Sequence, residues 1–185
     1  MKYITSMDNP CIICDRNHQN ETVEHIIPKS LGNEYYVMPK GMVCYECNNR
    51  FAKIENRVVS SKVFIKERRK YGLMSKVNKE IKALENQDLI YFMAKIGMES
   101  MYRSKLKIWH QLDWKHVKDF LIERKPSPVF NDRKLPESIQ FSSIPGWINW
   151  FRLRNNHLSL EYATAEKRLY IRFQFGQIKT WLRLH

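Results

Sequence analysis

The sequence predicts an α+β protein in which a small cysteine-rich unit, a helical segment and a C-terminal antiparallel β meander follow one another. Three observations predict this order. Two Cys-x-x-Cys pairs enclose the first part of the chain, apolar residues recur at helical spacing in the middle, and apolar and polar residues alternate near the end. We expect two domains, residues 1–60 and residues 61–185, the second with helices at about 79–125 and strands at about 147–184.

The composition is that of a globular protein with a core of its own, since 43% of the residues are hydrophobic and 12% are aromatic. No window of the sequence has the ~18 uninterrupted apolar residues that a membrane span needs, and the N-terminus lacks the apolar run of a signal peptide. We therefore expect a cytoplasmic protein that does not bind a membrane. In that compartment, paired cysteines favour a bound metal over disulfide bonds.

The net charge of +13 is distributed unevenly along the chain. Residues 1–60 contain seven basic and seven acidic residues, whereas residues 61–185 contain 25 basic and 12 acidic residues. A strong basic excess favours a polyanionic partner, because each phosphate that a protein neutralises releases condensed counterions. On charge alone, a nucleic acid and a merely soluble lysine-rich surface are equally compatible with the sequence.

The four cysteines of the chain form two Cys-x-x-Cys pairs, Cys11 with Cys14 and Cys44 with Cys47. Each pair can present two thiolates to one ion, and two pairs complete a tetrahedron. We expect a structural Zn²⁺ ion, because four thiolates leave no open coordination position for a substrate. Reduced buried cysteines or a redox pair are the alternatives. His18 is a spare candidate ligand that we expect in an exposed loop.

The insert between the two cysteine pairs is long enough to fold by itself. The β-branched run Thr22–Ile27, which a proline ends, predicts a strand, and Ser30–Asn33 is typical of a turn. A second strand is expected at Val37–Val43. Apolar residues then recur at helical spacing over Tyr45–Val59, which places Asn48 in the first turn of a helix.

Residues 8–58 resemble the HNH, or ββα-metal, endonucleases, in the branch stabilised by two Cys-x-x-Cys pairs. The resemblance depends on a Glu-His-x-x-Pro motif that begins at Glu24 and on a Cys-x-x-Cys-Asn-x-x-Phe run that ends at Phe51. It implies a small zinc-bound ββα-metal unit that hydrolyses DNA. It also implies that Glu24 and Asn48 bind a catalytic metal ion and that His25 is the general base.

The chemistry of these side chains agrees with that role. Hydrolysis of a phosphodiester needs a base for water and a cation where negative charge develops on the phosphate and the leaving oxygen. A neutral imidazole such as that of His25 can accept a proton at physiological pH. The oxygen ligands of Glu24 and Asn48 suit Mg²⁺ or Mn²⁺. The alternative is that Glu24 and His25 are an ordinary strand pair and that Asn48 caps a helix.

One departure from the family pattern concerns the support of the base. The family usually has an asparagine in the loop before the second cysteine pair, where it orients the histidine, but Tyr35–Val43 contains none. Asn33 or a backbone carbonyl group could orient His25 instead.

Glu55 follows Asn48 by two helical turns on the same face of the predicted helix. Such a residue could contact the site. We expect a structural role for Glu55, in an ion pair with a basic neighbour, Lys53 or Arg57.

The middle of the chain predicts helices. Residues 60–78 form a basic connection whose structure the sequence leaves open. Apolar recurrence from about Lys79 to Trp109 predicts one long helix or two shorter ones, with Gly97 as a weak point. Asp113 is expected to cap a further helix that ends at about Arg124.

The last part of the chain has the alternation of an antiparallel sheet. Tight turns are expected at Asn155–Asn156 and at Gly176. Four strands are expected, at Trp147–Arg154, Leu158–Tyr162, Leu169–Phe175 and Ile178–Leu184.

Aromatic and basic residues alternate on one face of this predicted sheet, where they could contact bases and phosphates. A solvated face, or a surface for a second copy or an accessory protein, is the alternative. The candidate nucleic-acid-binding residues, beside the aromatic Tyr170, are Trp150, Arg152, Arg154, Arg172, Lys179, Trp181 and Arg183.

Taken together, the sequence predicts a metal-dependent DNA endonuclease in which His25 activates water and one Mg²⁺ or Mn²⁺ ion stabilises the phosphate and the leaving oxygen. RNA is the second choice of substrate, and cleavage of both strands would need a homodimer or two events. Two alternatives remain. One is a non-catalytic, zinc-stabilised nucleic-acid-binding module, and the other is the nuclease subunit of a multi-protein defence or mobile-element system.

Overall fold

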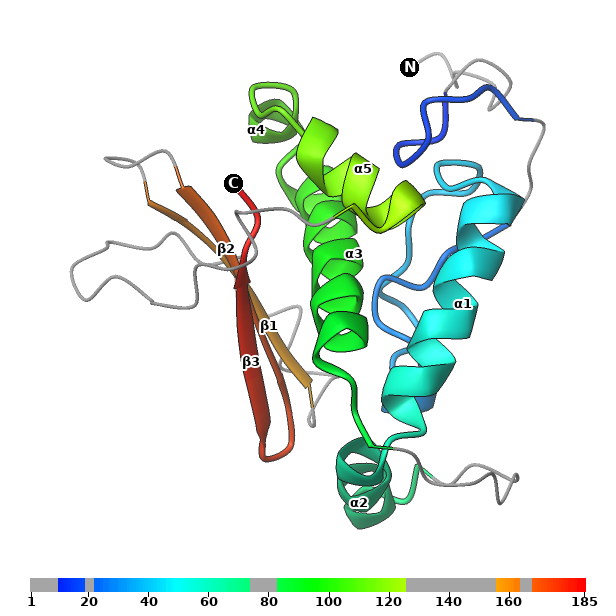
Figure 1. Ribbon diagram of the computed structural model, residues 1–185, viewed down its shortest axis with the longest axis vertical. Coiled ribbons are helices and arrows are strands. Elements are labelled where there is room, and N and C mark those ends of the chain that lie inside the picture. Colours follow the sequence, from blue (N-terminus) through cyan, green and yellow to red (C-terminus); the bar gives the residue numbers. More distant parts are fainter. Residues whose placement is uncertain (1–9, 19–21, 74–82, 126–155, 164–167) are drawn as a thin grey trace.

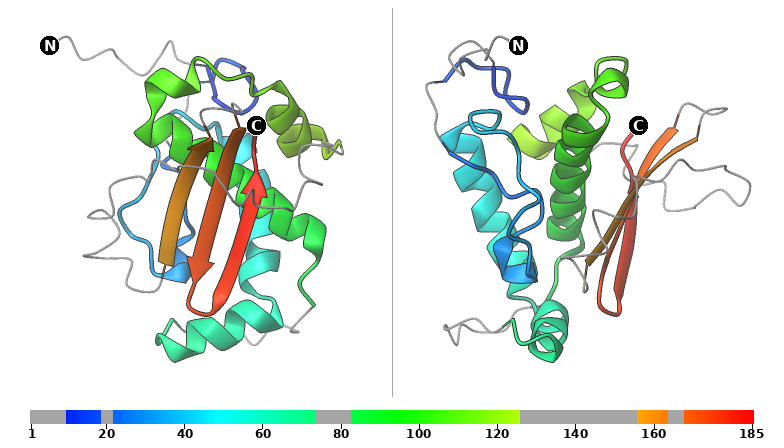
Figure 2. Two further views of the ribbon diagram at one scale, coloured as in Figure 1. Left: turned by 90° about the vertical axis from the view of Figure 1, so that its left-hand side faces the viewer. Right: turned by 180° about the vertical axis from the view of Figure 1, so that it is seen from behind.

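A computed structural model describes residues 10–18, 22–73, 83–125, 156–163 and 168–185. Helix α3 lies at the centre, between α1 on one side and the C-terminal sheet on the other (Figures 1 and 2). The helical elements are η1 (Lys29–Leu31), α1 (Tyr45–Val59), α2 (Lys62–Lys70), α3 (Asn86–Ser104), α4 (Leu106–Trp109) and α5 (Lys115–Glu123). The strands are β1 (Asn156–Ala163), β2 (Arg168–Phe175) and β3 (Ile178–Arg183).

Helix α1 has the bounds that the apolar spacing predicts. Its side chains Phe51, Ile54 and Val58 are buried, because residues three and four apart lie on one face of a helix. The helix begins after Cys44, whose sulfur accepts a hydrogen bond from the backbone N–H of Cys47 at 3.4 Å. The second cysteine pair is thereby built into the first turn of α1.

The predicted hairpin before α1 is shorter than expected. Only one isolated antiparallel bridge forms within the described part of this segment, between His25 and Val37. Backbone bonds from Ile26 N to Tyr36 O at 3.1 Å and from Met38 N to Glu24 O at 2.8 Å extend it on either side. The pairing stays this short in the described residues because proline has no N–H to donate to a ladder: Pro28 ends the first predicted strand, and Pro39 interrupts the second.

The region that the sequence left open contains helix α2. Its residue Arg68 is buried and donates a hydrogen bond to Ser30 O at 2.9 Å and another to Val59 O at 3.2 Å. These bonds connect α2 to the end of α1 and to η1, the short helix that contains Ser30.

Helix α3 is the central element because it is buried on all sides from Tyr91 to Met101. The helix continues through Gly97, which is therefore a packing position and not a weak point. A Cβ atom there would lie 2.4 Å from Leu184 Cδ1 and 3.2 Å from Ile171 Cδ1. Glycine thus allows the sheet to approach α3 closely. A separate short helix, α4, follows after Lys105.

Helix α5 follows where the sequence predicts a further helix. The N-cap of α5 is Trp114, which makes no capping hydrogen bond through its side chain, so the predicted capping role of Asp113 is wrong by one position. The carboxylate of Asp113 accepts a hydrogen bond from the backbone N–H of Lys115 at 2.8 Å, just before the helix. On the core side, Val117, Phe120 and Leu121 are buried.

The described strands form an antiparallel meander in the order β1-β2-β3, as predicted. The alternating side chains of β2 that the sequence placed on one face are buried toward α3, and Phe173 contacts Phe92 edge to face with ring centroids 5.7 Å apart. Gly176, with φ +57°, forms the expected turn. The expected strand Trp147–Arg154 lies outside the described residues.

Two details of the meander correct the sequence analysis. Asn156, expected in a turn, is the first residue of β1 and pairs with Phe175. Tyr170, expected on the face opposite the core, is buried with 1% of its surface exposed.

The buried core is continuous across residue 60 in the described parts of the chain. Phe51 of α1 contacts Tyr91 of α3 with ring centroids 6.0 Å apart, and Arg57 donates two hydrogen bonds of 2.6 Å to the carboxylate of Asp88. The division into two domains at residue 60 stays a prediction. No helix in the described ranges is long and apolar enough to cross a membrane.

Candidate metal and active site

The four cysteines converge, as the two Cys-x-x-Cys pairs predict. Their sulfur atoms all lie within 4.8 Å of one another, and those of Cys14 and Cys44 are 3.8 Å apart. A tetrahedral zinc ion with Zn–S bonds of about 2.3 Å separates its sulfur ligands by about 3.8 Å. The donor set and its spacing therefore fit one zinc ion, and these residues could hold it as a structural ion.

Hydrogen bonds to sulfur stabilise thiolate character within this cluster. Cys11 accepts a bond from the backbone N–H of Cys44 at 3.3 Å, and its contact with the thiol of Cys47 lowers its pKa to about 4. The same contact raises the pKa of Cys47, so within this pair the thiolate is favoured on Cys11. The spare candidate His18 lies beside the cluster, with Nε2 3.9 Å from Cys14 Sγ.

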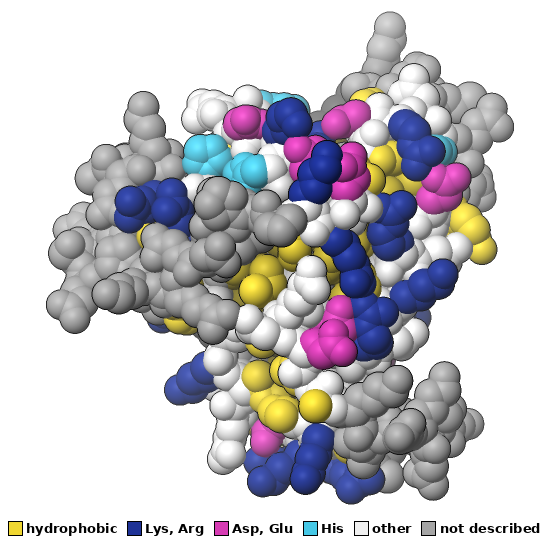
Figure 3. All heavy atoms as spheres, in the orientation of Figure 1, with side chains coloured by type: hydrophobic (Ala, Val, Ile, Leu, Met, Phe, Trp, Pro, Cys, Tyr) yellow, Lys and Arg dark blue, Asp and Glu magenta, His cyan; other side chains and the backbone are white. Residues whose placement is uncertain are grey.

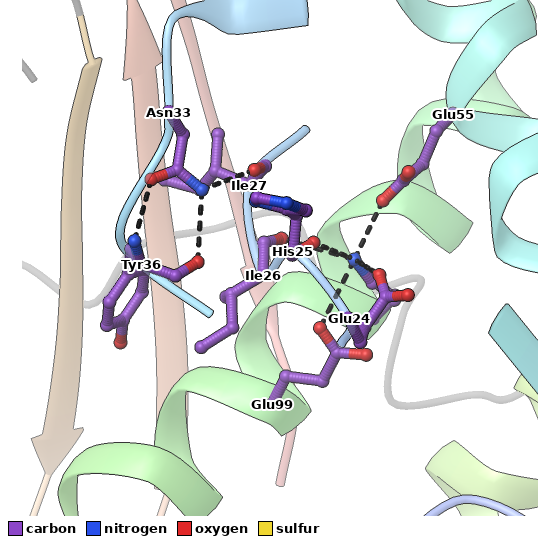
Figure 4. Close-up of polar contacts among 9 residues, drawn as sticks. Glu24, His25, Ile26, Ile27, Asn33, Tyr36, Glu55 and Glu99 are labelled. Atoms are coloured by element: carbon purple, nitrogen blue, oxygen red, sulfur yellow. Dashed lines mark hydrogen bonds and ion pairs between the residues drawn. The ribbon is translucent and has the colours of Figure 1, made fainter. Parts of the chain in front are cut away.

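Glu24, the predicted ligand of the catalytic metal, is buried at the start of the hairpin with 4% of its surface exposed. Its Oε1 lies 2.5 Å from the Nζ atom of Lys95, a residue of α3. Figure 4 shows Glu24, Glu55 and Glu99 arranged around this one ammonium group. The three carboxylates come from the hairpin, from α1 and from α3.

Lys95 is 1% exposed, and its Nζ atom has two further carboxylate contacts, at 2.7 Å to Glu55 and 3.2 Å to Glu99. It also donates hydrogen bonds to the backbone carbonyl groups of His25, at 2.7 Å, and Ile26, at 3.3 Å. Burial alone would lower the pKa of Lys95, but the carboxylates raise it well above its ordinary value, so the amine is charged.

The carboxylates respond to the same burial. Burial raises the pKa of the Glu24 carboxyl, although the neighbouring Lys95 opposes that rise. Burial also raises the pKa of Glu99 well above its ordinary value. One lysine thus faces three acidic groups, and Glu99 is the least exposed of them. Its burial therefore favours the neutral form of its carboxyl group.

His25, the predicted base, is half-buried beside Lys95 and its three carboxylates. Its Nδ1 atom is buried and has no hydrogen-bond partner in the described part of the chain, which leaves Nε2 as the nitrogen that can meet water. Burial lowers the pKa of the imidazole, and the charges of Lys29 and Lys95 lower it further while Glu55 opposes them. The neutral form that a base requires is therefore favoured.

Asn33 does not orient His25 through its side chain. The Asn33 amide group donates to Ile27 O at 2.5 Å and to Tyr36 O at 3.0 Å, and its Oδ1 accepts from Tyr36 N at 2.9 Å (Figure 4). Asn33 is 1% exposed, so these bonds close the loop between the two halves of the hairpin. Its role is to support the backbone next to the site.

Asn48, the second predicted metal ligand, lies in the first turn of α1 directly after Cys47. Its backbone N–H donates to Cys44 O at 2.9 Å, and the residue is half-buried. Across the described residues, no hydrogen bond joins its side chain to Glu24 or His25. The hydrogen bond to Cys44 fixes the Asn48 backbone beside the cysteine cluster, whereas the approach of the Asn48 side chain to Glu24 stays a prediction.

Glu55 contacts the site and does not form the expected pair with a basic neighbour on its own helix. Its carboxylate bonds to Lys95 at 2.7 Å, while Arg57 bonds to Asp88. The helical spacing that placed Glu55 on the face of Asn48 indicated this contact.

Lys95 and Glu99 were not among the site residues predicted from the sequence. A partial signal was present, because these two are the charged residues in the largely apolar stretch from Leu89 to Met101. An acidic residue four positions after a lysine lies on the same side of a helix. A charged pair of this kind within an apolar helix indicates a buried ionic contact.

The candidate nucleic-acid-binding residues are described in part. Arg172 and Lys179 are exposed, and Trp181 and Arg183 are half-buried. Trp150, Arg152 and Arg154 lie outside the described residues. A second group of exposed basic side chains covers α2, at the bottom of Figure 3, and consists of Lys62, Lys66, Arg69 and Lys70.

Comparison with known proteins supports the resemblance from which the site residues were predicted. Residues 11–62 match the sequence model of the HNH endonuclease family, a range that contains the four cysteines, Glu24, His25 and Asn48. Searches of curated proteins and of solved structures gave no match. The match confirms the resemblance to HNH endonucleases for this segment, and it indicates nuclease activity on a nucleic acid in general terms.

Proposed function

We propose that this protein is an endonuclease that hydrolyses phosphodiester bonds in DNA, on the premise that residues 11–62 form an HNH endonuclease unit. The observation that carries this proposal is the placement of the Glu24-His25 pair. The pair lies on a hairpin segment beside α1, and α1 begins within a cysteine cluster that fits zinc. RNA is the second candidate substrate, and we expect a cytoplasmic protein because the paired cysteines suit a reducing compartment.

In the proposed reaction, His25 accepts a proton from water at Nε2. Its lowered pKa keeps the imidazole neutral near pH 7, and the burial of Nδ1 leaves Nε2 as the reactive nitrogen. The water oxygen then attacks the phosphorus atom, and the bond to the leaving oxygen breaks. The product is a cut strand.

The catalytic cation of this proposal is Mg²⁺ or Mn²⁺. When bound, it supplies positive charge to the phosphate and the leaving oxygen. Glu24 and Asn48 would hold it, because both offer the hard oxygen atoms that these ions prefer. Glu24 contacts Lys95 through Oε1. Its second oxygen, Oε2, is therefore the atom that we assign to the metal.

The proposal is tested by cleavage of plasmid DNA with wild type and His25→Ala in the presence of Mg²⁺, Mn²⁺ or a chelator. We expect metal-dependent cleavage by the wild type and a loss of about 100-fold or more for His25→Ala, the usual contribution of a general base. DNA binding, measured by fluorescence anisotropy, should survive the substitution.

The matched control is His110→Ala, which removes an exposed histidine at the end of α4. That variant should cut at the wild-type rate. Equal cleavage by wild type and His25→Ala would remove His25 from the mechanism.

One observation favours a second candidate, a zinc-stabilised nucleic-acid-binding module without catalysis. The ammonium group of Lys95 already pairs with Glu24, so the carboxylate has a cation in the absence of any metal. Such a module would bind DNA or RNA in a salt-sensitive way and cut neither in any metal. The same cleavage panel therefore separates the two candidates. A homodimer or an accessory protein that restores cleavage would instead identify a subunit of a larger system.

A further inference from the structure

We infer that Lys95 of α3 is a positioning residue of the Glu24-His25 site, and that the family-like segment 11–62 needs α3 to complete that site. This inference rests on the proposed function. Lys95 lies outside the segment that matches the HNH family, so the chain supplies it from its C-terminal part.

The first support is the direction in which one ammonium group donates its hydrogen bonds. Lysine has three N–H donors. The three shortest distances from Lys95 Nζ are to Glu24 Oε1 at 2.5 Å, to the backbone oxygen of His25 at 2.7 Å and to Glu55 Oε1 at 2.7 Å. The donors therefore go to the proposed metal ligand, to the backbone of the proposed base and to α1.

The second support is the free energy of burying a charge. An ammonium group taken out of water is strongly destabilising unless it is paired and hydrogen-bonded. Lys95 is 1% exposed, and its Nζ atom lies within hydrogen-bond distance of three carboxylates and two backbone carbonyl groups, so its position is fixed by its partners. The hairpin backbone at His25 and the carboxylate of Glu24 are fixed with it.

The third support is what the loop before the second cysteine pair lacks. That loop has no asparagine to orient His25, and Asn33 is engaged with the loop backbone. The Nδ1 atom of His25 has no partner among the described residues. Lys95 instead holds the backbone carbonyl group of His25 through a hydrogen bond. We infer that fixing the backbone in this way takes the place of a direct hydrogen bond to the imidazole ring.

A matched structural interaction allows a positioning role to be separated from a stabilising one. Arg57 and Asp88 form a second ion pair between α1 and α3, with two bonds of 2.6 Å. Among the described residues, neither of the two is hydrogen-bonded to Glu24 or His25. Asp88→Asn should therefore weaken the packing of α1 on α3 and leave the site in place.

Three full-length, zinc-loaded variants test the inference: Lys95→Met, the double variant Lys95→Met/Glu99→Met, and Asp88→Asn. The double variant covers the case in which Lys95→Met alone fails to fold. The double variant also removes Glu99, the fully buried carboxyl group that would otherwise be left without its partner. Glu24 and Glu55 lose their contact with Lys95 in both variants, so the effect of that loss is common to the two.

The first readout is steady-state cleavage of DNA. We expect the double variant to lose about 100-fold in kcat, the order of effect caused by misplacing reacting groups by about 1 Å. KM for DNA should not change, because Lys95 is buried and cannot contact the substrate. Asp88→Asn should keep the wild-type kcat.

The second readout needs no catalytic metal and no activity. The backbone amide signals of Ile26 and Ile27 follow the two carbonyl groups that accept from Lys95, so their NMR shifts report those hydrogen bonds. We expect these signals to move in the Lys95 variants and to stay in place in Asp88→Asn.

Wild-type kcat in the double variant, or unmoved Ile26 and Ile27 signals, would overturn the inference. So would an equal loss of kcat in Asp88→Asn, because Lys95 would then act only through stability. Failure of the proposed function is distinguishable, because in that case the wild type itself does not cut while the amide shifts still test the hydrogen bonds of Lys95.

Discussion

The ammonium group of Lys95, on α3, lies 2.5 Å from a carboxylate oxygen of Glu24, in the hairpin segment before α1. The two residues belong to the two parts into which charge and pattern divide the sequence. Their contact means that the arrangement of the family-like segment depends on the helix that packs against it. Stability and activity should therefore be linked at this position.

Zinc binding should depend on each cysteine of the cluster. Cys47→Ser replaces a buried ligand, so we expect the purified protein to lose most of its zinc and to unfold at a lower temperature. Structural zinc in small domains contributes about 10–16 kcal/mol of apparent binding free energy. Metal content by atomic absorption and thermal unfolding by circular dichroism are the measurements.

The control for the cysteine variant is Asn49→Ser, an exposed position two residues along α1. It should keep zinc and the wild-type unfolding temperature. Retention of a full zinc complement by Cys47→Ser would show that the four sulfur atoms do not bind one ion together.

The pH dependence of cleavage should respond to Lys29. Burial lowers the pKa of His25 first, and the positive charge of Lys29 lowers it further, with Lys95 acting in the same direction and Glu55 against it. A base works in its neutral form, so activity is lost as the pH falls through this lowered pKa. Lys29→Gln removes a positive charge and raises the pKa, so the acid limb of kcat/KM should move to higher pH.

The measurement is a kcat/KM profile from about pH 5 to 8, the range in which histidine titrates. Lys53→Gln is the control, because it removes an exposed charge on α1 that does not affect His25. An unmoved acid limb in Lys29→Gln would show that another group sets it.

Asn33→Ala should destabilise the protein more than its small change in volume suggests. The substitution removes the side-chain partner of the buried Ile27 carbonyl group and of the half-buried Tyr36 N–H. The Tyr36 carbonyl group loses one bond and keeps the one from Ile26 N. Unsatisfied buried polar groups cost about 1–3 kcal/mol each, so we expect a loss of at least about 1 kcal/mol in the free energy of unfolding.

Urea denaturation measures this loss. Glu34→Ala, at the exposed neighbouring position, should change stability little. Equal stability of both variants would mean that water replaces the bonds of Asn33.

The sheet face should contribute to nucleic-acid binding more than α2 does. The variant Arg172→Gln/Lys179→Gln/Arg183→Gln should bind DNA more weakly, with a salt dependence that is less steep by about 0.9 for each phosphate that the protein no longer neutralises. The comparison variant on α2 carries the same change of charge and consists of Lys62→Gln, Lys66→Gln and Arg69→Gln.

Binding isotherms at several salt concentrations separate the two surfaces. A larger loss of affinity and of salt dependence in the α2 variant would assign nucleic-acid binding to that helix. Equal, small effects in both would leave the sheet face as a solvated or protein-binding surface.

Local spacing and residue type were enough to predict several elements of this protein. Helix α1 was predictable because its apolar residues recur every three or four positions, and the convergence of the four cysteines because two Cys-x-x-Cys pairs are the usual spacing of a metal site. The meander followed from alternation in its strands. Glu24, His25 and Asn48 were named as candidates through the motif in which they stand, and their roles stay predictions.

Only the tertiary structure decided which distant groups meet. Lys95 reaches Glu24 because α3 packs against α1 and the hairpin, and no spacing along the chain encodes that pairing. Gly97 is a packing position because Leu184 lies against it. Lys95 and Gly97 share one cause. A buried charge or a missing side chain strongly restricts which groups can pack around it. Burial is a property of the folded chain and not of its local sequence.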